Sequence, residues 1–167
     1  MDSRHLIIMR HATADPDGHR DHERPLTAQG LNEARRVGLS LRSKGPIPDR
    51  ILCSSALRCR QTWQAVSAEL ECSATVDFQD DLYNASAASL LHSLAAVGEG
   101  QTVLLLAHNP GVSVLAQELA GGDEEGIARL PVGFAPATLA CFGVEGTWSL
   151  ISAASARLIR LERAPQP

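Results

Sequence analysis

The sequence lacks long apolar runs, an excess of positive charge and cysteines at paired spacing. Its longest apolar runs are far too short to cross a bilayer, and its first residues lack the long apolar stretch of a signal peptide. We therefore expect a cytoplasmic protein that does not bind membranes. The net charge of −4 argues against the dense cationic surface used in general nucleic-acid binding, so we expect no nucleic-acid partner.

The cysteines form neither a CxxC pair nor a spaced metal-binding quartet. We expect reduced thiols that pack as small apolar groups, at Cys53, Cys59, Cys72 and Cys141. His19 and His22 lie in a polar loop without a third ligand at a suitable spacing. We therefore expect neither of them to bind a metal ion.

What the chain does have is the composition of an ordinary globular domain. Its 167 residues are 44% hydrophobic and 20% charged, which is enough for one core and carries no signature of disorder. We expect one domain over residues 1–163 and a flexible tail over 164–167. Strand-like and helix-like segments alternate along most of the sequence, which indicates an α/β layer architecture.

Hydrophobic periodicity and turn residues predict the individual elements. Single strands are expected at residues 5–10, 50–53, 74–78, 103–107 and 157–163. An antiparallel hairpin is expected from residues 139–144 and 147–152, joined by Glu145-Gly146. Helices are expected between Thr27 and Gly45, over 59–70, over 90–97 and from 110 to about 120.

Four basic side chains closely follow the buried strands. Arg10 and His11 end the first strand, and His108 directly follows a continuously apolar strand. Arg58 lies one short turn after another strand. Open α/β sheets place their chemistry at the carboxyl ends of the strands, so we expect these side chains to converge on one phosphate.

These residue types suit phosphoryl transfer, which needs anion neutralisation and an in-line nucleophile. The planar guanidinium groups of Arg10 and Arg58 can make paired hydrogen bonds to phosphate oxygens. Neutral imidazole is nucleophilic at physiological pH and forms a hydrolysable phosphoramidate, so we assign His11 as the nucleophile. His108 is expected to be a charged or hydrogen-bonding partner of the transferring group.

With these residues in place, the sequence resembles the histidine phosphatase superfamily, which has the phosphoglycerate mutase-like fold. The matching segments follow the family's order and span most of the chain: Met9-Arg10-His11-Ala12, Arg24-Pro25-Leu26-Thr27-Ala28-Gln29-Gly30, Ser54-Ser55-Ala56-Leu57-Arg58-Cys59-Arg60-Gln61-Thr62 and Ala107-His108-Asn109-Pro110-Gly111. The Arg-Pro-Leu-Thr segment and the small size look most like the bacterial phosphohistidine phosphatases of the SixA type.

The resemblance implies a three-layer α/β/α sandwich with a mostly parallel central sheet. It implies a phosphorylated His11 in a pocket completed by Arg10, Arg58 and His108. It also implies that the reaction needs no metal and no cofactor.

Two further residues are candidates for substrate binding. Asn109 is expected to cap a helix that begins at Pro110, and the free backbone amides of that helix would add positive potential beside the phosphate. The resemblance suggests that Arg24 contacts an anionic substrate at the rim of the pocket. A salt bridge from Arg24 to Asp21 or Glu23, which would shape the loop, is the alternative.

This sequence departs from many relatives in the segment that supplies a general acid. Those relatives carry a Glu after the third strand, where this chain has Gln79-Asp80-Asp81-Leu82-Tyr83. A phosphoramidate leaves through nitrogen, which is more readily protonated than an alkoxide, so a dedicated acid matters less. We therefore predict a protein phosphohistidine phosphatase. Asp81 is either a proton donor or a solvated turn residue.

Several alternatives stay open at this stage. The same residues could serve a phosphatase for sugars or other small metabolites, or a non-catalytic phosphate-binding module. A cysteine phosphatase is disfavoured, because its Cys and Arg are separated by five residues, whereas four residues separate Cys53 from Arg58. A metal-dependent hydrolase is disfavoured, because a metal bound by His11 and His108 would lie beside two arginines. A mutase is disfavoured, because it usually has a longer inserted segment than this chain. The partner is a phosphorylated protein or a small phosphorylated metabolite, and the oligomeric state is undetermined.

Overall fold

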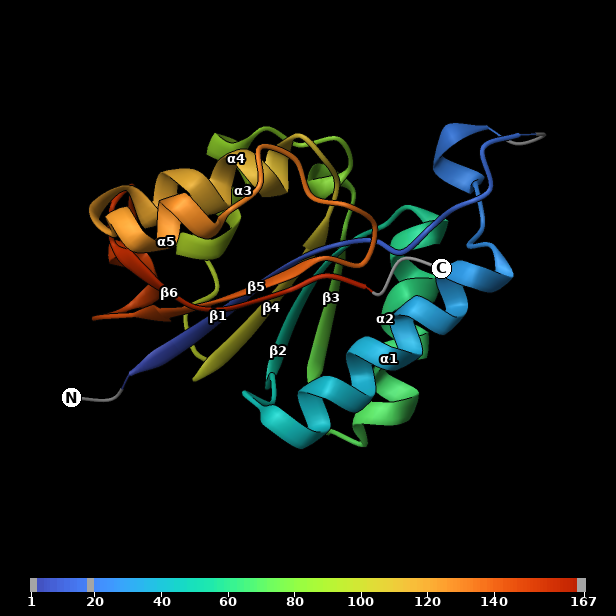
Figure 1. Cartoon of the computed structure of the whole chain (residues 1–167), viewed down its shortest axis with the longest axis horizontal. Coiled ribbons are helices and arrows are strands. Elements are labelled where there is room, and N and C mark those ends of the chain that lie inside the picture. Colours follow the sequence, from blue (N-terminus) through green and yellow to red (C-terminus); the bar gives the residue numbers. More distant parts are fainter. Residues whose placement is uncertain (1–2, 18–19, 165–167) are drawn as a thin grey trace.

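The computed structural model describes residues 3–17 and 20–164, and its centre is one six-stranded sheet of order β3-β2-β4-β1-β5-β6 (Figure 1). The strands, in chain order, are β1 Arg4–Arg10, β2 Arg50–Ser54, β3 Thr75–Gln79, β4 Thr102–Ala107, β5 Leu139–Val144 and β6 Ala156–Glu162. Neighbours from β3 to β1 pair in parallel, whereas β5 is antiparallel to both β1 and β6. The sheet is therefore mostly parallel, as predicted.

Helices cover both faces of this sheet (Figure 1). One layer contains α1 (Ala28–Lys44) and α2 (Leu57–Leu70), which pack against each other. The opposite layer contains α3 (Ala87–Ala95), α4 (Gly111–Leu119) and α5 (Glu124–Arg129). The prediction of a three-layer α/β/α sandwich is thus confirmed.

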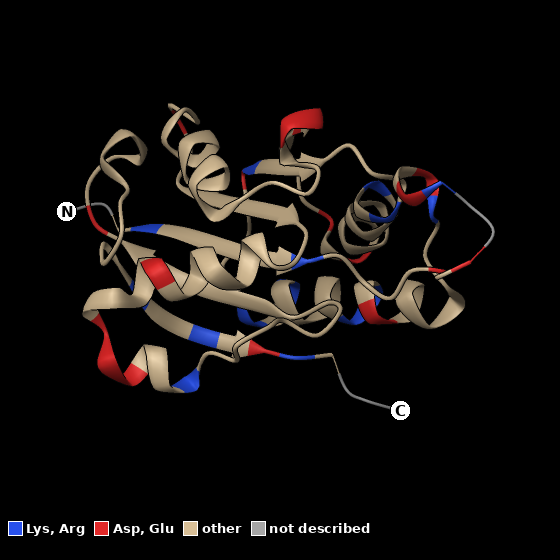
Figure 2. Ribbon diagram, turned by 90° about the horizontal axis from the view of Figure 1, so that it is seen from above, with Lys and Arg blue, Asp and Glu red and all other residues tan. Residues whose placement is uncertain are grey.

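The central strands read as continuous apolar runs because both of their faces are covered. In β1, Leu6 and Ile8 belong to the core cluster beneath α3 and α4, while Ile7 and Met9 belong to the cluster beneath α1 and α2. All four side chains are fully buried. Charged residues of both signs are spread over the helices and loops, and the middle of the sheet carries few of them (Figure 2).

Helix α1 begins and ends where the sequence predicts. The Thr27 hydroxyl accepts a hydrogen bond from the Gly30 amide at 3.0 Å, so Thr27 is the N-cap. Gly45 follows the last helical residue with φ of +60°, a backbone conformation that glycine adopts without strain.

The predicted hairpin at the sheet edge is wrong in its second strand. Residues 147–152 contain a short 3₁₀ turn, Trp148–Leu150, and the strand that pairs with β5 on the side away from β1 is β6. The Trp148 ring is fully buried and its Nε1 donates to the Gly100 carbonyl at 2.8 Å. Burial of this ring draws the segment away from the sheet, and the chain pairs with β5 only after residue 155.

The predicted helix cap at Asn109 is also wrong. Helix α4 begins at Gly111, its N-cap is Pro110, and no side chain caps it. The Asn109 amide instead donates from Nδ2 to the Phe134 carbonyl at 2.7 Å. This contact is long-range, so the local sequence pattern could not indicate it.

The boundaries of the predicted domain are only partly described. Ala164 packs against the core cluster beneath α1 and α2, and residues 165–167 of the predicted tail lie outside the described residues. The single domain over 1–163 stays a prediction. Within the described part of the chain, no helix combines the length and the apolar character needed to cross a membrane.

Candidate active site

The parallel pairing of β1 with β4 brings the two histidines together. Arg10 lies opposite Ala107 in the register, so His11 and His108 follow at the same edge of the sheet. Their ring centroids are 5.3 Å apart with an interplanar angle of 58°. Strand β2 lies on the other side of β4, and helix α2 begins three residues after β2 ends. The first turn of α2 thus carries Arg58 to the same edge.

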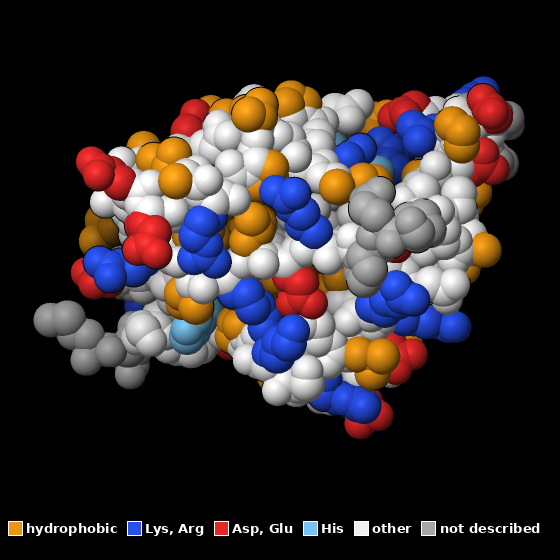
Figure 3. Space-filling model, in the orientation of Figure 1, with side chains coloured by type: hydrophobic (Ala, Val, Ile, Leu, Met, Phe, Trp, Pro, Cys, Tyr) orange, Lys and Arg blue, Asp and Glu red, His pale blue; other side chains and the backbone are white. Residues whose placement is uncertain are grey.

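Arg58 connects the two imidazoles. Its Nε donates to His11 Nε2 at 3.2 Å, and its Nη2 faces His108 Nδ1 at 3.2 Å. The three residues are only 7% (His11), 4% (Arg58) and 3% (His108) exposed, so they are largely shielded from water. Arg and His side chains gather at the upper right of the space-filling view, beside acidic side chains (Figure 3).

These contacts determine the protonation of His11. Because Arg58 donates to Nε2, that nitrogen carries the lone pair, and the ring proton lies on Nδ1, which faces the Ala12 carbonyl at 2.8 Å. Burial lowers the pKa of His11 to about 4, and the charge of Arg58 acts in the same direction against the opposing Ala12 hydrogen bond. His11 is therefore a neutral imidazole whose unprotonated nitrogen faces Arg58.

His108 is also neutral, because of its hydrogen bond from Arg58 and its burial. Its Nδ1 accepts from Arg58, and its Nε2 donates to the Ser54 hydroxyl at 2.7 Å. Burial lowers the pKa of His108 to about 3, with further contributions from His11 and Arg58. Of the two roles expected for this residue, the structure favours the hydrogen-bonding one in the free protein.

Arg10 is held beside this group by the segment before β5. Its Nη1 donates to the Phe134 carbonyl at 2.7 Å, the same carbonyl that Asn109 contacts. Burial lowers the pKa of Arg10, and the charges of Arg58 and Arg24 lower it further. The Arg10 Nε is buried without a hydrogen-bond partner among the described residues. Such a donor is well suited to an incoming anion.

The loop after β1 is fixed by the start of helix α1. Both the amide and the hydroxyl of Thr13 donate to the buried Glu33 carboxylate at 2.9 Å. The Thr27 amide donates to the Thr13 carbonyl at 3.0 Å. A Cβ on Gly30 would lie 2.0 Å from this carbonyl, so only glycine allows the approach. The Arg-Pro-Leu-Thr-Ala-Gln-Gly segment therefore positions His11 through the loop that follows it.

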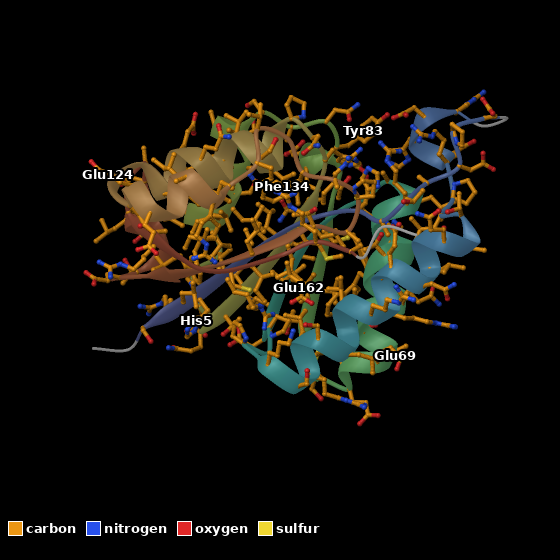
Figure 4. All side chains as sticks on the ribbon, viewed as in Figure 1. His5, Glu69, Tyr83, Glu124, Phe134 and Glu162 are labelled. Atoms are coloured by element: carbon orange, nitrogen blue, oxygen red, sulfur yellow. The ribbon has the colours of Figure 1, made fainter. Side chains whose placement is uncertain are left out.

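Asp21, Arg24 and Tyr83 form the mouth of the site. The Asp21 carboxylate accepts from Arg24 Nη1 at 3.0 Å and from Arg58 Nη2 at 3.2 Å, and it also accepts from the Tyr83 hydroxyl. Tyr83 lies among nitrogen-bearing side chains at this end of the molecule (Figure 4). Arg24 thus forms the salt bridge to Asp21 that was one alternative, and its contact with a substrate stays a prediction.

Of three other residues considered from the sequence, one lies apart from this cluster, one lies outside the described residues, and His22 packs against Tyr83 with ring centroids 4.9 Å apart. Asp81 is exposed and lines a hollow with residues of α3, and no hydrogen bond joins it to the described site residues. His22 Nε2 lies 2.9 Å from the Ser55 hydroxyl, and His19 lies outside the described residues. The structure therefore does not bring Asp81 into position as a proton donor.

The cysteines do not provide an alternative nucleophile. All four are free, and three of them are buried. Burial raises the pKa of the Cys53 thiol well above its usual value and that of Cys59 to about 12. Because the thiolate is the nucleophilic form, neither side chain is suited to attack phosphorus.

Sequence reasoning missed the supporting residues Glu33, Ser54 and Tyr83. Tyr83 is the single tyrosine of the chain, and it follows a strand that ends beside β2. Because Tyr83 follows β3 and Arg58 follows the neighbouring strand β2, the sequence could have indicated that Tyr83 lies near the site. The roles of Glu33 and Ser54 depend on contacts between distant segments and had no comparable signal in the sequence.

Known proteins show similarity to this chain in both sequence and structure. The family model described as "Histidine phosphatase superfamily (branch 1)" matches residues 6–87. The chain is 36% identical over 156 residues to the uncharacterised protein Rv1276c of Mycobacterium tuberculosis, covering 90% of this chain and 96% of that protein. It is 31% identical over 121 residues to the phosphohistidine phosphatase SixA of Escherichia coli, covering 71% of this chain and 75% of SixA.

A solved structure gives the same result. A protein from Nakamurella multipartitia, assigned as the phosphohistidine phosphatase SixA, aligns with a TM-score of 0.85 and 33% identity over 97% of this chain and 96% of that chain. His108 lies beyond the residues matched by the family model, but the pairing of β1 with β4 places it beside His11. On the sequence identity and the shared structure, the chain belongs to the histidine phosphatase superfamily.

Proposed function

We propose that this protein is a phosphohistidine phosphatase that acts on phosphorylated proteins through a phosphoryl group held transiently on His11. Membership of the family supports a phosphatase. The observation that carries the proposal is the orientation of His11, whose unprotonated Nε2 faces the Arg58 guanidinium while Nδ1 faces the Ala12 carbonyl. This is the nucleophilic tautomer of the imidazole, and the Arg58 guanidinium beside it can hold an anion.

The reaction would proceed in two displacements. His11 Nε2 attacks phosphorus, and the bond from phosphorus to the substrate nitrogen breaks, with its electron pair returning to the substrate imidazole. Arg58 and Arg10 neutralise the transferring group. Water then attacks the phosphoryl group on His11, which releases orthophosphate and regenerates the neutral imidazole. No step requires a metal or a cofactor.

Neither Asp21 nor Asp81 is suited to act as an acid, which favours a nitrogen leaving group. Asp21 has a pKa lowered to about 2, chiefly by the hydrogen bond from Tyr83, so it carries no proton to donate near neutral pH. Asp81 lies apart from the described site residues. An alkoxide would therefore leave without assistance from these carboxyls, whereas the imidazole of phosphohistidine can be protonated before it leaves.

The surface beside the site supports a protein substrate. Val132 is 90% exposed and lies two residues before Phe134, whose carbonyl is bonded to Arg10 and Asn109. An exposed apolar side chain at this position offers a contact to a polypeptide, which a sugar phosphate would not use. Hydrolysis of small phosphorylated metabolites and non-catalytic phosphate binding are the competing functions. The cytoplasmic location and the roles of Arg24 and Asn109 in substrate binding stay predictions.

A His11→Ala variant tests the proposal. We expect it to abolish turnover of a phosphohistidine peptide and of an aryl phosphate while the circular dichroism spectrum stays that of the wild type. Wild-type protein quenched during turnover should carry acid-labile phosphate, and the variant should carry none.

Substrate preference and metal dependence need separate measurements. We expect faster turnover of the phosphohistidine peptide than of sugar phosphates, and unchanged rates in the presence of a chelator. Faster turnover of sugar phosphates would contradict the proposed substrate. Loss of activity in chelator that returns with added metal would contradict the proposed mechanism.

A further inference from the structure

The Asp21 carboxylate occupies an unusual position for a phosphate pocket, because it brings negative charge to the arginine that must bind an anion. Its Oδ2 accepts from Arg58 Nη2 at 3.2 Å, and its backbone carbonyl accepts from Arg58 Nη1 at 2.6 Å. Arg24 Nη1 donates to Oδ1 at 3.0 Å, and Tyr83 donates its hydroxyl proton to Oδ2. The carboxylate is thus ionised and held by three side chains.

Asp21 stands on the solvent side of the catalytic groups. Its side chain is 49% exposed, whereas that of Arg58 is 4% exposed. A phosphoryl group bound to Arg58 and facing His11 directs its leaving group away from His11, because attack and departure are in line. Because the two histidines are buried and the Asp21 side chain is half exposed on Arg58, we infer that the leaving group points towards Asp21.

We propose that Asp21 determines substrate specificity by charge, favouring phosphohistidine over phosphate esters at the leaving-group side of the pocket. The proposal rests on the proposed function. A substrate imidazole that is phosphorylated on one nitrogen and protonated on the other carries a positive charge on its ring, and the Asp21 carboxylate attracts that charge. An ester develops negative charge on its leaving oxygen, which the same carboxylate repels.

The proton and electron balance of this step is simple. The phosphorylated imidazolium arrives with its proton already on the second ring nitrogen, and this N–H donates to Asp21. When the phosphorus–nitrogen bond breaks, its electrons return to the ring, and a neutral imidazole leaves. Asp21 stays ionised throughout, so it acts as a counter-ion and not as an acid.

The experiment compares Asp21→Asn with the wild type on a phosphohistidine peptide and on an aryl phosphate. We expect the ratio of the two kcat/KM values to fall by at least about tenfold, as for the loss of a hydrogen bond to a charged group. Asp77→Asn, an exposed change on the edge strand β3, is the matched control and should keep the wild-type ratio. Asp21→Glu, which keeps the charge, should retain most of the preference.

Inhibition by orthophosphate separates a charge effect from a loosened pocket. The neutral amide of the Asp21→Asn variant would no longer compete with the anion for Arg58, so orthophosphate should inhibit this variant more tightly than the wild type. The proposal would be overturned if orthophosphate inhibited Asp21→Asn more weakly than the wild type and kcat/KM fell equally on both substrates. An unchanged ratio in an enzyme that does turn over phosphohistidine would overturn the role of Asp21 alone. Failure of the wild type on phosphohistidine would overturn the proposed function as well.

Discussion

Arg58 is the residue on which the geometry of the site depends. Its Nε donates to His11 and its Nη1 to the Asp21 backbone carbonyl, while its Nη2 contacts both His108 and the Asp21 carboxylate. A lysine ammonium has no planar fork and could not hold these partners at fixed directions. The sequence indicated that the four basic residues meet. The tautomer of each imidazole could be assigned only from its hydrogen-bond partners in the structure.

The protonation of His11 predicts the acid limb of the activity profile. The imidazole must be unprotonated to attack, and its pKa is about 4 instead of the ordinary 6.5. We therefore expect kcat/KM for an aryl phosphate, corrected for ionisation of the substrate, to stay level from about pH 7 to about pH 5 and to fall below that range. A decline in kcat/KM centred near pH 6.5, the ordinary pKa of histidine, would contradict the argument that burial lowers the pKa of His11. Circular dichroism at each pH controls for unfolding.

At the scale of elements, α1 packs closely against the C-terminal half of α2, the helix whose first turn carries Arg58. Gly38 is buried on the face of α1 that packs on α2. A Cβ there would lie 2.4 Å from the Val66 carbonyl and 2.9 Å from Glu69 Cβ, so the helices could not keep their spacing. Helical periodicity predicted both helices, but it could not show that their contact excludes one methyl group.

Gly38→Ala is the corresponding prediction. Although alanine favours a helix, we expect a loss of about 1–3 kcal/mol in the free energy of unfolding, because overpacking outweighs helix propensity. Chemical denaturation measures this loss. Gly121→Ala is the matched control, since its added Cβ would meet Ala154 at an ordinary 3.4 Å. Equal stability of Gly38→Ala and the wild type would show that the two helices separate at little cost.

The whole molecule buries two histidines in their neutral forms, which makes folding sensitive to acid. The pKa values of His11 and His108 are about 4 and about 3 in the folded protein, against 6.5 ordinarily. Below about pH 6.5 the unfolded chain takes up protons that the folded protein does not. Stability is therefore lost as the pH falls from that value towards about 4.

We expect this loss to be measurable by denaturant unfolding between pH 7 and pH 5. Each histidine contributes a slope of up to about 1.4 kcal/mol per pH unit in that window. Asp21 acts at lower pH, because its pKa is depressed from 3.8 to about 2, and its contribution is lost only as the pH falls through that range. Replacement of both histidines by glutamine should flatten the slope. Parallel slopes for the wild type and the double variant would contradict this account.

The sequence by itself determined the layers of the fold and the four basic residues at the strand ends. It could do so because apolar periodicity and strand-end position are local properties of the chain. Three features were decided by tertiary structure alone. They are the pairing of β5 with β6, the hydrogen bond from Asn109 to the Phe134 carbonyl and the position of Asp81 beside α3. Tertiary structure also decided that the Asp21 carboxylate lies on Arg58. Each of these depends on a contact between distant segments, and the energy of such a contact is not encoded in any short stretch of residues.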